Sequence, residues 1–241
     1  MLYTADTPLD CACVIHGSAY DWIYVDRLFS MLQRHLTRPV RLHVYTEADR
    51  PVPDHMIKHS LQDWEFSSDR NAWWYKLQLF NTQHHHGPLL YFDLDVVIVN
   101  NIDWLWQHNL RHFWTIRDFK HLWKPNFTGA NTSIMWWDTA QYAHVWQAVQ
   151  DQNIDTFVKK YRGDQDFVSD IIAVEQRRFF HIDRIKSWRW ECQDGGFDFT
   201  QRKHLAPGTG TAINKDTSVL VFHGSPKPHE ILDNFVVKHW C

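Results

Sequence analysis

The sequence predicts an α/β fold in which helices cover both faces of an open, mainly parallel sheet. Two observations carry this prediction. In the first half of the chain, short β-prone segments alternate with segments of helical periodicity, as in βαβ units. Residues 89–99 are apolar on both faces, as strands in the middle of a covered sheet are. A length of 241 residues suits one such domain and argues against two independent ones.

Local patterns predict the elements of the first half in order. Residues 10–16 are short, apolar and β-prone, which indicates a strand. Residues 21–35 place apolar side chains roughly on one helix face, and residues 40–46 alternate apolar with polar side chains, as a strand does. Residues 71–86 have helical spacing, which Gly87 and the proline after it bring to an end.

The rest of the chain is mixed. Residues 89–99 predict one buried strand that two carboxylates interrupt. Residues 128–138 and 219–223 have the pattern of strands, and residues 139–150 and 164–174 that of helices. Open sheets of this kind bind ligands beyond the carboxyl ends of their strands, so we expect the functional site at that edge.

Charge and hydropathy exclude some classes of protein. The chain has 25 Lys+Arg against 28 Asp+Glu and a formal charge of -3, which disfavours a nucleic-acid partner. No apolar run reaches the length of a membrane span, and the first residues lack the pattern of a signal peptide. We expect a cytoplasmic protein without a transmembrane segment, and peripheral membrane contact stays open.

The cysteines and one histidine run receive a structural interpretation. The four cysteines contain no paired zinc-knuckle spacing and are interpreted as free thiols. Cys11 and Cys13 lie two apart in a strand, so both should point the same way into packing. Residues 84–86 are three histidines before a Gly-Pro stop, where complementing a helix dipole is a more common role than binding a metal.

The strongest chemical signal is the pair Asp93 and Asp95 inside the apolar segment. Burying two carboxylates within a sheet costs several kcal/mol unless a cation compensates them, so they should lie at a strand end and face a ligand. With a period of two they point the same way and form an oxygen site suited to Mg²⁺ or Mn²⁺. The alternative is a pair of capping or salt-bridged aspartates.

Five stretches together carry a resemblance to a known family. Residues 90–102 resemble the DxD segment of nucleotide-sugar glycosyltransferases with the GT-A fold, and most of all family 8, which contains glycogenin and bacterial lipopolysaccharide galactosyltransferases. Residues 74–77, 131–135, 163–166 and 222–228 resemble four further motifs of that family, in the family's order. Each match is weak alone, but five in order are specific.

The resemblance implies an architecture and a division of the chain. It implies a GT-A type, Rossmann-like open mixed sheet with helices on both faces, built as a single domain over residues 1–241. Residues 1–100 would form the nucleotide-binding half. Residues 101–241 would bind the acceptor and complete the metal site.

The resemblance also assigns roles to residues. Asp93, Asp95 and His223 would bind Mn²⁺, or Mg²⁺, and an imidazole ligand favours Mn²⁺. Asp164, Gln165 and Asn131 would face the reacting sugar as catalytic residues. The nucleotide-sugar donor, expected to be a UDP-sugar, would contact His16, Gly17, Tyr20, Lys76, Asp93, Gly224 and Lys227.

The predicted reaction is metal-dependent transfer of a hexose from the nucleotide-sugar to a glycan or another hydroxyl acceptor, with retention at the anomeric carbon. Two alternatives stay open. A sugar-phosphate nucleotidylyltransferase shares the architecture, although the turn after the first strand is poor in glycine and basic residues. A non-catalytic GT-A-like scaffold that binds carbohydrate is the other.

Overall fold

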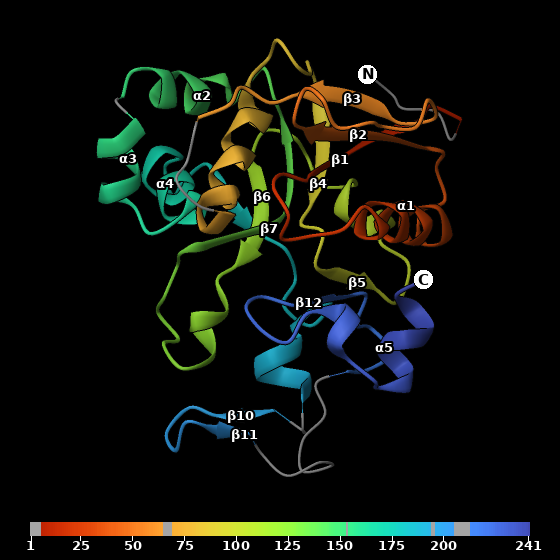
Figure 1. Ribbon diagram of the computed structural model, residues 1–241. Coiled ribbons are helices and arrows are strands. Elements are labelled where there is room, and N and C mark those ends of the chain that lie inside the picture. Colours follow the sequence, from red (N-terminus) through yellow and green to blue (C-terminus); the bar gives the residue numbers. More distant parts are fainter. Residues whose placement is uncertain (1–5, 65–68, 153, 194–195, 205–212) are drawn as a thin grey trace.

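The computed structural model describes residues 6–64, 69–152, 154–193, 196–204 and 213–241. Its centre is a seven-stranded mixed sheet with the order β3-β2-β1-β4-β7-β6-β8, and helices pack on both faces (Figure 1). The predicted fold class is therefore confirmed. The strands are β1 (Leu9–Val14), β2 (Val40–Thr46), β3 (Ile57–Ser60), β4 (Pro88–Phe92), β6 (Phe113–Arg117), β7 (Ala130–Asp138) and β8 (Arg177–Phe179).

Strand directions place the functional edge. Strands β3, β2, β1 and β4 run parallel to one another, whereas β7 runs antiparallel to both β4 and β6. The first residues of β7 therefore lie at the same edge as the carboxyl ends of β1 and β4. The Asp93 N–H donates to the Ser133 carbonyl at 2.8 Å, which ties the two strands together at that edge.

Helices of three kinds surround the sheet. The α-helices are α1 (Ile23–His35), α2 (Ala143–Gln150), α3 (Ile154–Lys160), α4 (Asp164–Ile171) and α5 (Asn234–His239). The 3-10 helices are η1 (Asp69–Phe80), η2 (Asp103–Leu105), η3 (Phe119–Leu122) and η6 (Pro228–Glu230), and η4 (Trp188–Cys192) is a short π-helix. Helix α1 lies on one side of the sheet in Figure 1, and α2, α3 and α4 lie together on the other side.

Two apolar cores result from this arrangement, one on each face of the sheet. Alternating residues of β4 divide between them, since Leu90 and Phe92 pack with α1 while Leu89 and Tyr91 pack with η1, α2 and α4. Cys11 and Cys13 are buried in the first core and are free thiols, as predicted.

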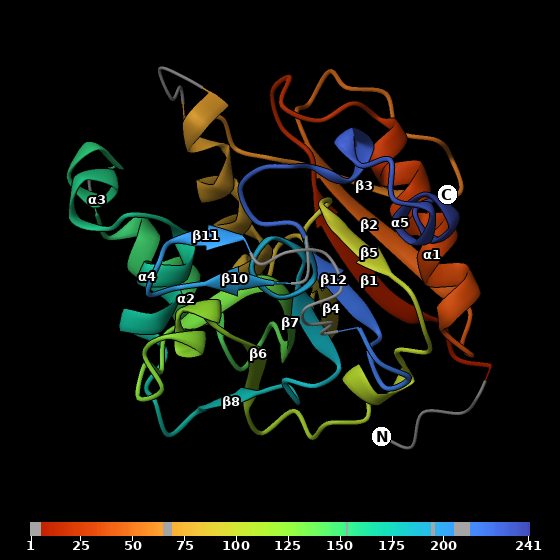
Figure 2. The same ribbon diagram turned by 90° about the horizontal axis from the view of Figure 1, so that it is seen from below.

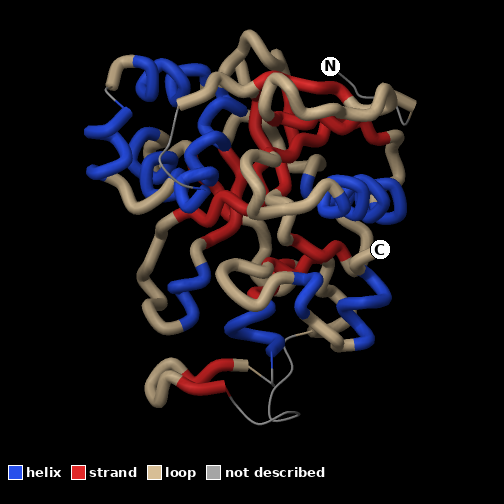
Figure 3. The backbone as a smooth tube through the Cα atoms, in the orientation of Figure 1, coloured by secondary structure: helices blue, strands red, loops and turns tan. Residues whose placement is uncertain are grey.

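Two small sheets lie beside the main one. One has the order β5-β12-β9, from β5 (Val96–Ile98), β12 (Val219–Val221) and β9 (Ile185–Ser187). The other is the hairpin of β10 (Phe197–Asp198) and β11 (Lys203–His204). It projects below the body of the molecule in Figure 1 and lies in front of the body when the molecule is seen from below in Figure 2. Helices and strands alternate through the upper part of the molecule in Figure 3, and the small sheets lie below it.

Several sequence-based elements need correction. Residues 89–99 do not form one strand, because the chain turns at Asp93–Asp95 and continues as β5 in a different sheet. The helix predicted over 71–86 is the 3-10 helix η1, which ends at Phe80, so the histidines at 84–86 do not end a helix. Helix 164–174 ends at Ile171. None of the described helices has the length and apolar character needed to cross a bilayer.

Candidate active site

A cavity of about 500 Å³ opens at the carboxyl edge of the main sheet. It is lined by the segments that follow β1 and β4, by the start of β7, by the start of α4 and by the segment after β12. Most of the predicted site residues line it: His16, Tyr20, Lys76, Asp93, Asp95, Asn131, Asp164, Gln165, His223, Gly224 and Lys227. Because Lys76 adds helix η1 to these five segments, the structure brings six distant stretches of sequence to one site.

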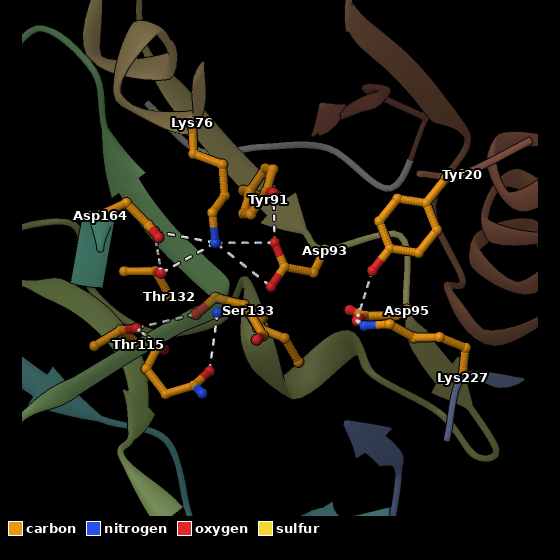
Figure 4. Close-up of polar contacts among 12 residues, drawn as sticks. Tyr20, Lys76, Tyr91, Asp93, Asp95, Thr115, Thr132, Ser133, Asp164 and Lys227 are labelled. Carbon is orange, nitrogen blue, oxygen red and sulfur yellow. Dashed lines mark hydrogen bonds and ion pairs between the residues drawn. The ribbon is translucent and has the colours of Figure 1, made fainter. Parts of the chain in front are cut away.

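The two aspartates lie in a turn. Asp93 follows the last residue of β4, and Asp95 immediately precedes β5. Leu94 between them is buried in the apolar core. Both carboxylates line the cavity, but each binds a different lysine (Figure 4).

Lys76 lies at the centre of the first cluster. Its buried ammonium group is 3.1 Å from Asp93 Oδ1, 3.0 Å from Asp164 Oδ2 and 3.2 Å from the Thr132 hydroxyl. Burial would lower the pKa of Lys76, but the two carboxylates outweigh it and raise that pKa above its ordinary value. Lys76 is therefore a fixed positive charge, and Figure 4 shows it between the two acids.

The partners of Lys76 are themselves held in place. Tyr91 donates its hydroxyl proton to Asp93 Oδ1 at 2.7 Å, and Thr132 donates to Asp164 Oδ2 at 2.5 Å. Burial raises the pKa of Asp164, and Lys76 opposes that shift. Both of these contacts to Asp164 use its Oδ2 atom.

Asp95 forms the second cluster. Its Oδ2 atom accepts from the Tyr20 hydroxyl at 2.9 Å and from Lys227 Nζ at 2.5 Å. Burial raises the pKa of Asp95, while the Lys227 ammonium opposes that shift and the charge of Asp93 adds to it. A buried carboxylate needs such a cation, and here a lysine supplies it.

His223 is brought to the cavity but has other partners. Its Nε2 atom lies 2.7 Å from the Ser187 hydroxyl, and its ring stacks on Phe119. Burial lowers the pKa of His223 to about 4, and the positive charges of Arg189 and Lys227 lower it as well. The imidazole is therefore neutral at physiological pH, which is the form that binds metals.

The two predicted glycines differ. Gly224 lines the cavity with a φ of 76°, in the left-handed region that favours glycine. Gly17 does not line it: its N–H donates to Glu47 Oε1 at 2.6 Å, and its carbonyl accepts from Arg50. Gly17 therefore forms the turn after β1, and the neighbouring His16 lines the cavity, stacked on Tyr75.

Sequence reasoning missed several residues of the site. Tyr91 and Thr132 lie within the motifs at residues 90–102 and 131–135. Alternation in a strand does not indicate which hydroxyl will donate a hydrogen bond to a carboxylate. Lys120 and Arg162 add two positive charges to the cavity wall. Arg162 directly precedes a recognised motif and could have been found, whereas Lys120 lies in a short helix that has no sequence signal.

The chemistry of Asp93, Asp95 and His223 fits a divalent cation. Two carboxylates and a neutral imidazole at one cavity suit Mn²⁺ better than Mg²⁺. In the part of the chain that the structure describes, their ligand atoms do not all lie within 4.8 Å of one another. An ion held by all three residues would therefore require these side chains to move closer together.

No sequence-family profile matches the chain, and no curated protein matches it in sequence. Solved structures do match it. An active-site mutant of LgtC has a TM-score of 0.60 at 11% identity, over 91% of this chain and 89% of LgtC. The glycosyltransferase GlyE of Streptococcus pneumoniae TIGR4 has a TM-score of 0.66 at 11% identity, over 98% of this chain and 60% of GlyE.

A third similar structure is the bifunctional glycosyltransferase WbbM, with a TM-score of 0.60 at 12% identity. The match covers 98% of this chain and 50% of WbbM. Structural matches at identities this low show that the fold is shared. All three matched proteins are glycosyltransferases. The chain therefore has the GT-A type fold of these glycosyltransferases.

Proposed function

We propose that this protein is a metal-dependent glycosyltransferase that moves a hexose from a nucleotide-sugar, a UDP-sugar, to a hydroxyl acceptor. One observation carries the proposal. Three acids, the buried Asp95 and Asp164 and the partly buried Asp93, meet two lysines in a single cavity at the carboxyl edge of the sheet. The fold supports it as well, since LgtC is a galactosyltransferase that was crystallised with donor and acceptor sugar analogues.

The donor's diphosphate would bind among the cavity's positive charges. Lys76, Lys120, Arg162 and Lys227 all line the cavity and carry positive charge suited to phosphate oxygens. His16 and its neighbours after β1 would hold the nucleoside, in agreement with the rule that such ligands lie beyond the ends of the strands.

The metal would be held by Asp93, Asp95 and His223. When bound, such an ion supplies Lewis-acid stabilisation of the charge that develops on the diphosphate leaving group. Asp95 keeps a compensating cation if Lys227 is exchanged for the ion, so its burial does not oppose the exchange. The released Lys227 ammonium would then be free to bind the diphosphate.

The sugar would lie against the start of α4 and of β7. Asp164, fixed through one oxygen by Lys76 and Thr132, would accept hydrogen bonds from sugar hydroxyls with the other. Gln165 and Asn131 line the same cavity and offer further amide contacts to the sugar or the acceptor. Retention at the anomeric carbon is the stereochemistry that we propose from the family resemblance.

A donor screen tests this proposal. UDP-, GDP- and ADP-sugars are incubated with the protein and Mn²⁺, and release of nucleoside diphosphate is measured. We expect release from a UDP-sugar, dependent on Mn²⁺ and abolished in Asp95→Ala. Asp54→Ala is the matched control. It changes an exposed acid that does not line the cavity, so it should keep full activity.

Circular dichroism and thermal unfolding show whether the Asp95 variant is folded. Full activity in folded Asp95→Ala would refute the metal assignment. Absence of turnover with every donor, together with no Mn²⁺-dependent UDP binding, would refute the proposed function itself.

A further inference from the structure

A second group of potential metal ligands lies away from the cavity. Asp10 is near the start of β1, His43 is in β2, and His85 is in the turn before β4. The cavity lies beyond the opposite, carboxyl ends of β1 and β4, where His16 and Asp93 follow these strands. The group is therefore separate from the proposed active site.

The three residues are close enough to share one ion. Each offers one ligand atom, and these atoms all lie within 4.8 Å of one another. Asp10 Oδ1 is 2.9 Å from His43 Nε2, and the rings of His43 and His85 are 4.9 Å apart between centroids. His43 is buried, whereas Asp10 and His85 are partly exposed, so an ion can reach the group from solvent.

The remaining ring nitrogens already have partners of the kind that orient metal ligands. His85 Nε2 lies 3.2 Å from the Pro88 carbonyl oxygen, which can only accept, so Nε2 carries the proton and Nδ1 keeps its lone pair. His43 Nδ1 lies 2.8 Å from His59 Nε2. Histidines that bind metals usually donate their second ring nitrogen to such an acceptor, which fixes the tautomer and the ring orientation.

We propose that Asp10, His43 and His85 form a binding site for a divalent transition-metal ion, and that this ion is Zn²⁺. Two imidazoles and one carboxylate are a donor set of zinc sites with three protein ligands, and water would take the fourth position. The ion would replace the proton that His43 Nε2 now shares with Asp10. It would join β1, β2 and the turn before β4, and so stabilise the fold at the end of the sheet opposite the cavity.

Arg41 would compete with the metal ion for Asp10, and this competition can be tested. Its guanidinium binds both oxygens of Asp10, with Nη2 2.7 Å from Oδ2 and Nε in contact with Oδ1. The Arg41 side chain is 49% exposed, so it can swing away when a metal binds. Removing this charge should strengthen zinc binding, whereas loss of a merely structural salt bridge should not.

The test is calorimetric titration of untagged protein with Zn²⁺ alone, in an Asp95→Asn background that removes an acid of the cavity. We expect one zinc site, an affinity at least about tenfold lower in His85→Ala, and a higher affinity in Arg41→Gln. The matched control is His86→Ala, which changes the adjacent exposed histidine and should leave the affinity unchanged.

Thermal unfolding gives a second readout that does not depend on catalysis. Zinc should raise the midpoint of the His86 variant but not that of the His85 variant, because an ion that binds only the folded state stabilises it. Equal zinc affinity in the two histidine variants, or no zinc binding in the background protein, would overturn the proposal. Unchanged or weaker binding in Arg41→Gln would overturn it too.

Discussion

The substitution Lys76→Met tests how the first acid cluster is held together. Met keeps most of the side chain's volume and removes the ammonium that contacts Asp93, Asp164 and Thr132. Two acids are then left without their cation, and Asp164 is buried. Breaking a buried ion pair by removing one partner costs about 3–5 kcal/mol. For a chain of this size, that corresponds to a fall in melting temperature of roughly 6–20 °C.

Urea denaturation followed by tryptophan fluorescence measures this loss, and the 14 Trp residues provide the signal. Lys215→Met is the matched control, because Lys215 is exposed and surface substitutions change stability by no more than about 0.5 kcal/mol. Adding Asp164→Asn to Lys76→Met should recover part of the loss, by about 1 kcal/mol or more, since one uncompensated charge is then gone.

Two results would refute this reasoning. A loss below about 1 kcal/mol in Lys76→Met would mean that water or another cation compensates the acids. Additive effects in the double variant would mean that Lys76 and Asp164 do not interact in the folded protein.

Three further predictions concern single contacts. Gly224→Ala places a side chain at φ 76°, so the free energy of unfolding should fall by about 1–2 kcal/mol in urea denaturation. Tyr20→Phe removes the hydrogen bond to Asp95 and should lower the same quantity by about 1.5–3 kcal/mol. Burial would raise the pKa of Glu47, but hydrogen bonds, chiefly from Arg50, lower it to about 2. Wild-type protein should therefore exceed Glu47→Gln in stability by about 1–2 kcal/mol at neutral pH, after allowance for solvent screening, and urea titrations should show this advantage vanish between about pH 4.5 and pH 2.

Sequence patterns located the elements best where one face of a strand or helix is apolar. The strand Val40–Thr46 has the bounds that its alternation predicts. The long apolar segment around Asp93 misled because β4 and β5 are both buried, and apolar content indicates burial without showing which strand pairs with which. Its two acids mark the point where the chain leaves one sheet for another.

The grouping of the site residues at one cavity was predictable, but their contacts with one another were not. Lys76, Asp93 and Asp164 were each expected at the donor, and all three line the cavity. Their mutual pairing could not be predicted, because it depends on how η1, β4 and α4 meet in space. The same holds for Lys227, which was expected at the donor and forms an ion pair with Asp95.

Calorimetry of UDP binding tests the central claim most directly, since it needs neither the correct sugar nor the acceptor. We predict that UDP binds wild-type protein in the presence of Mn²⁺, binds far more weakly without the ion, and shows no ion dependence in Asp95→Ala. Equal UDP affinity with and without Mn²⁺ in the wild-type protein, or unchanged Mn²⁺ dependence in Asp95→Ala, would contradict the account.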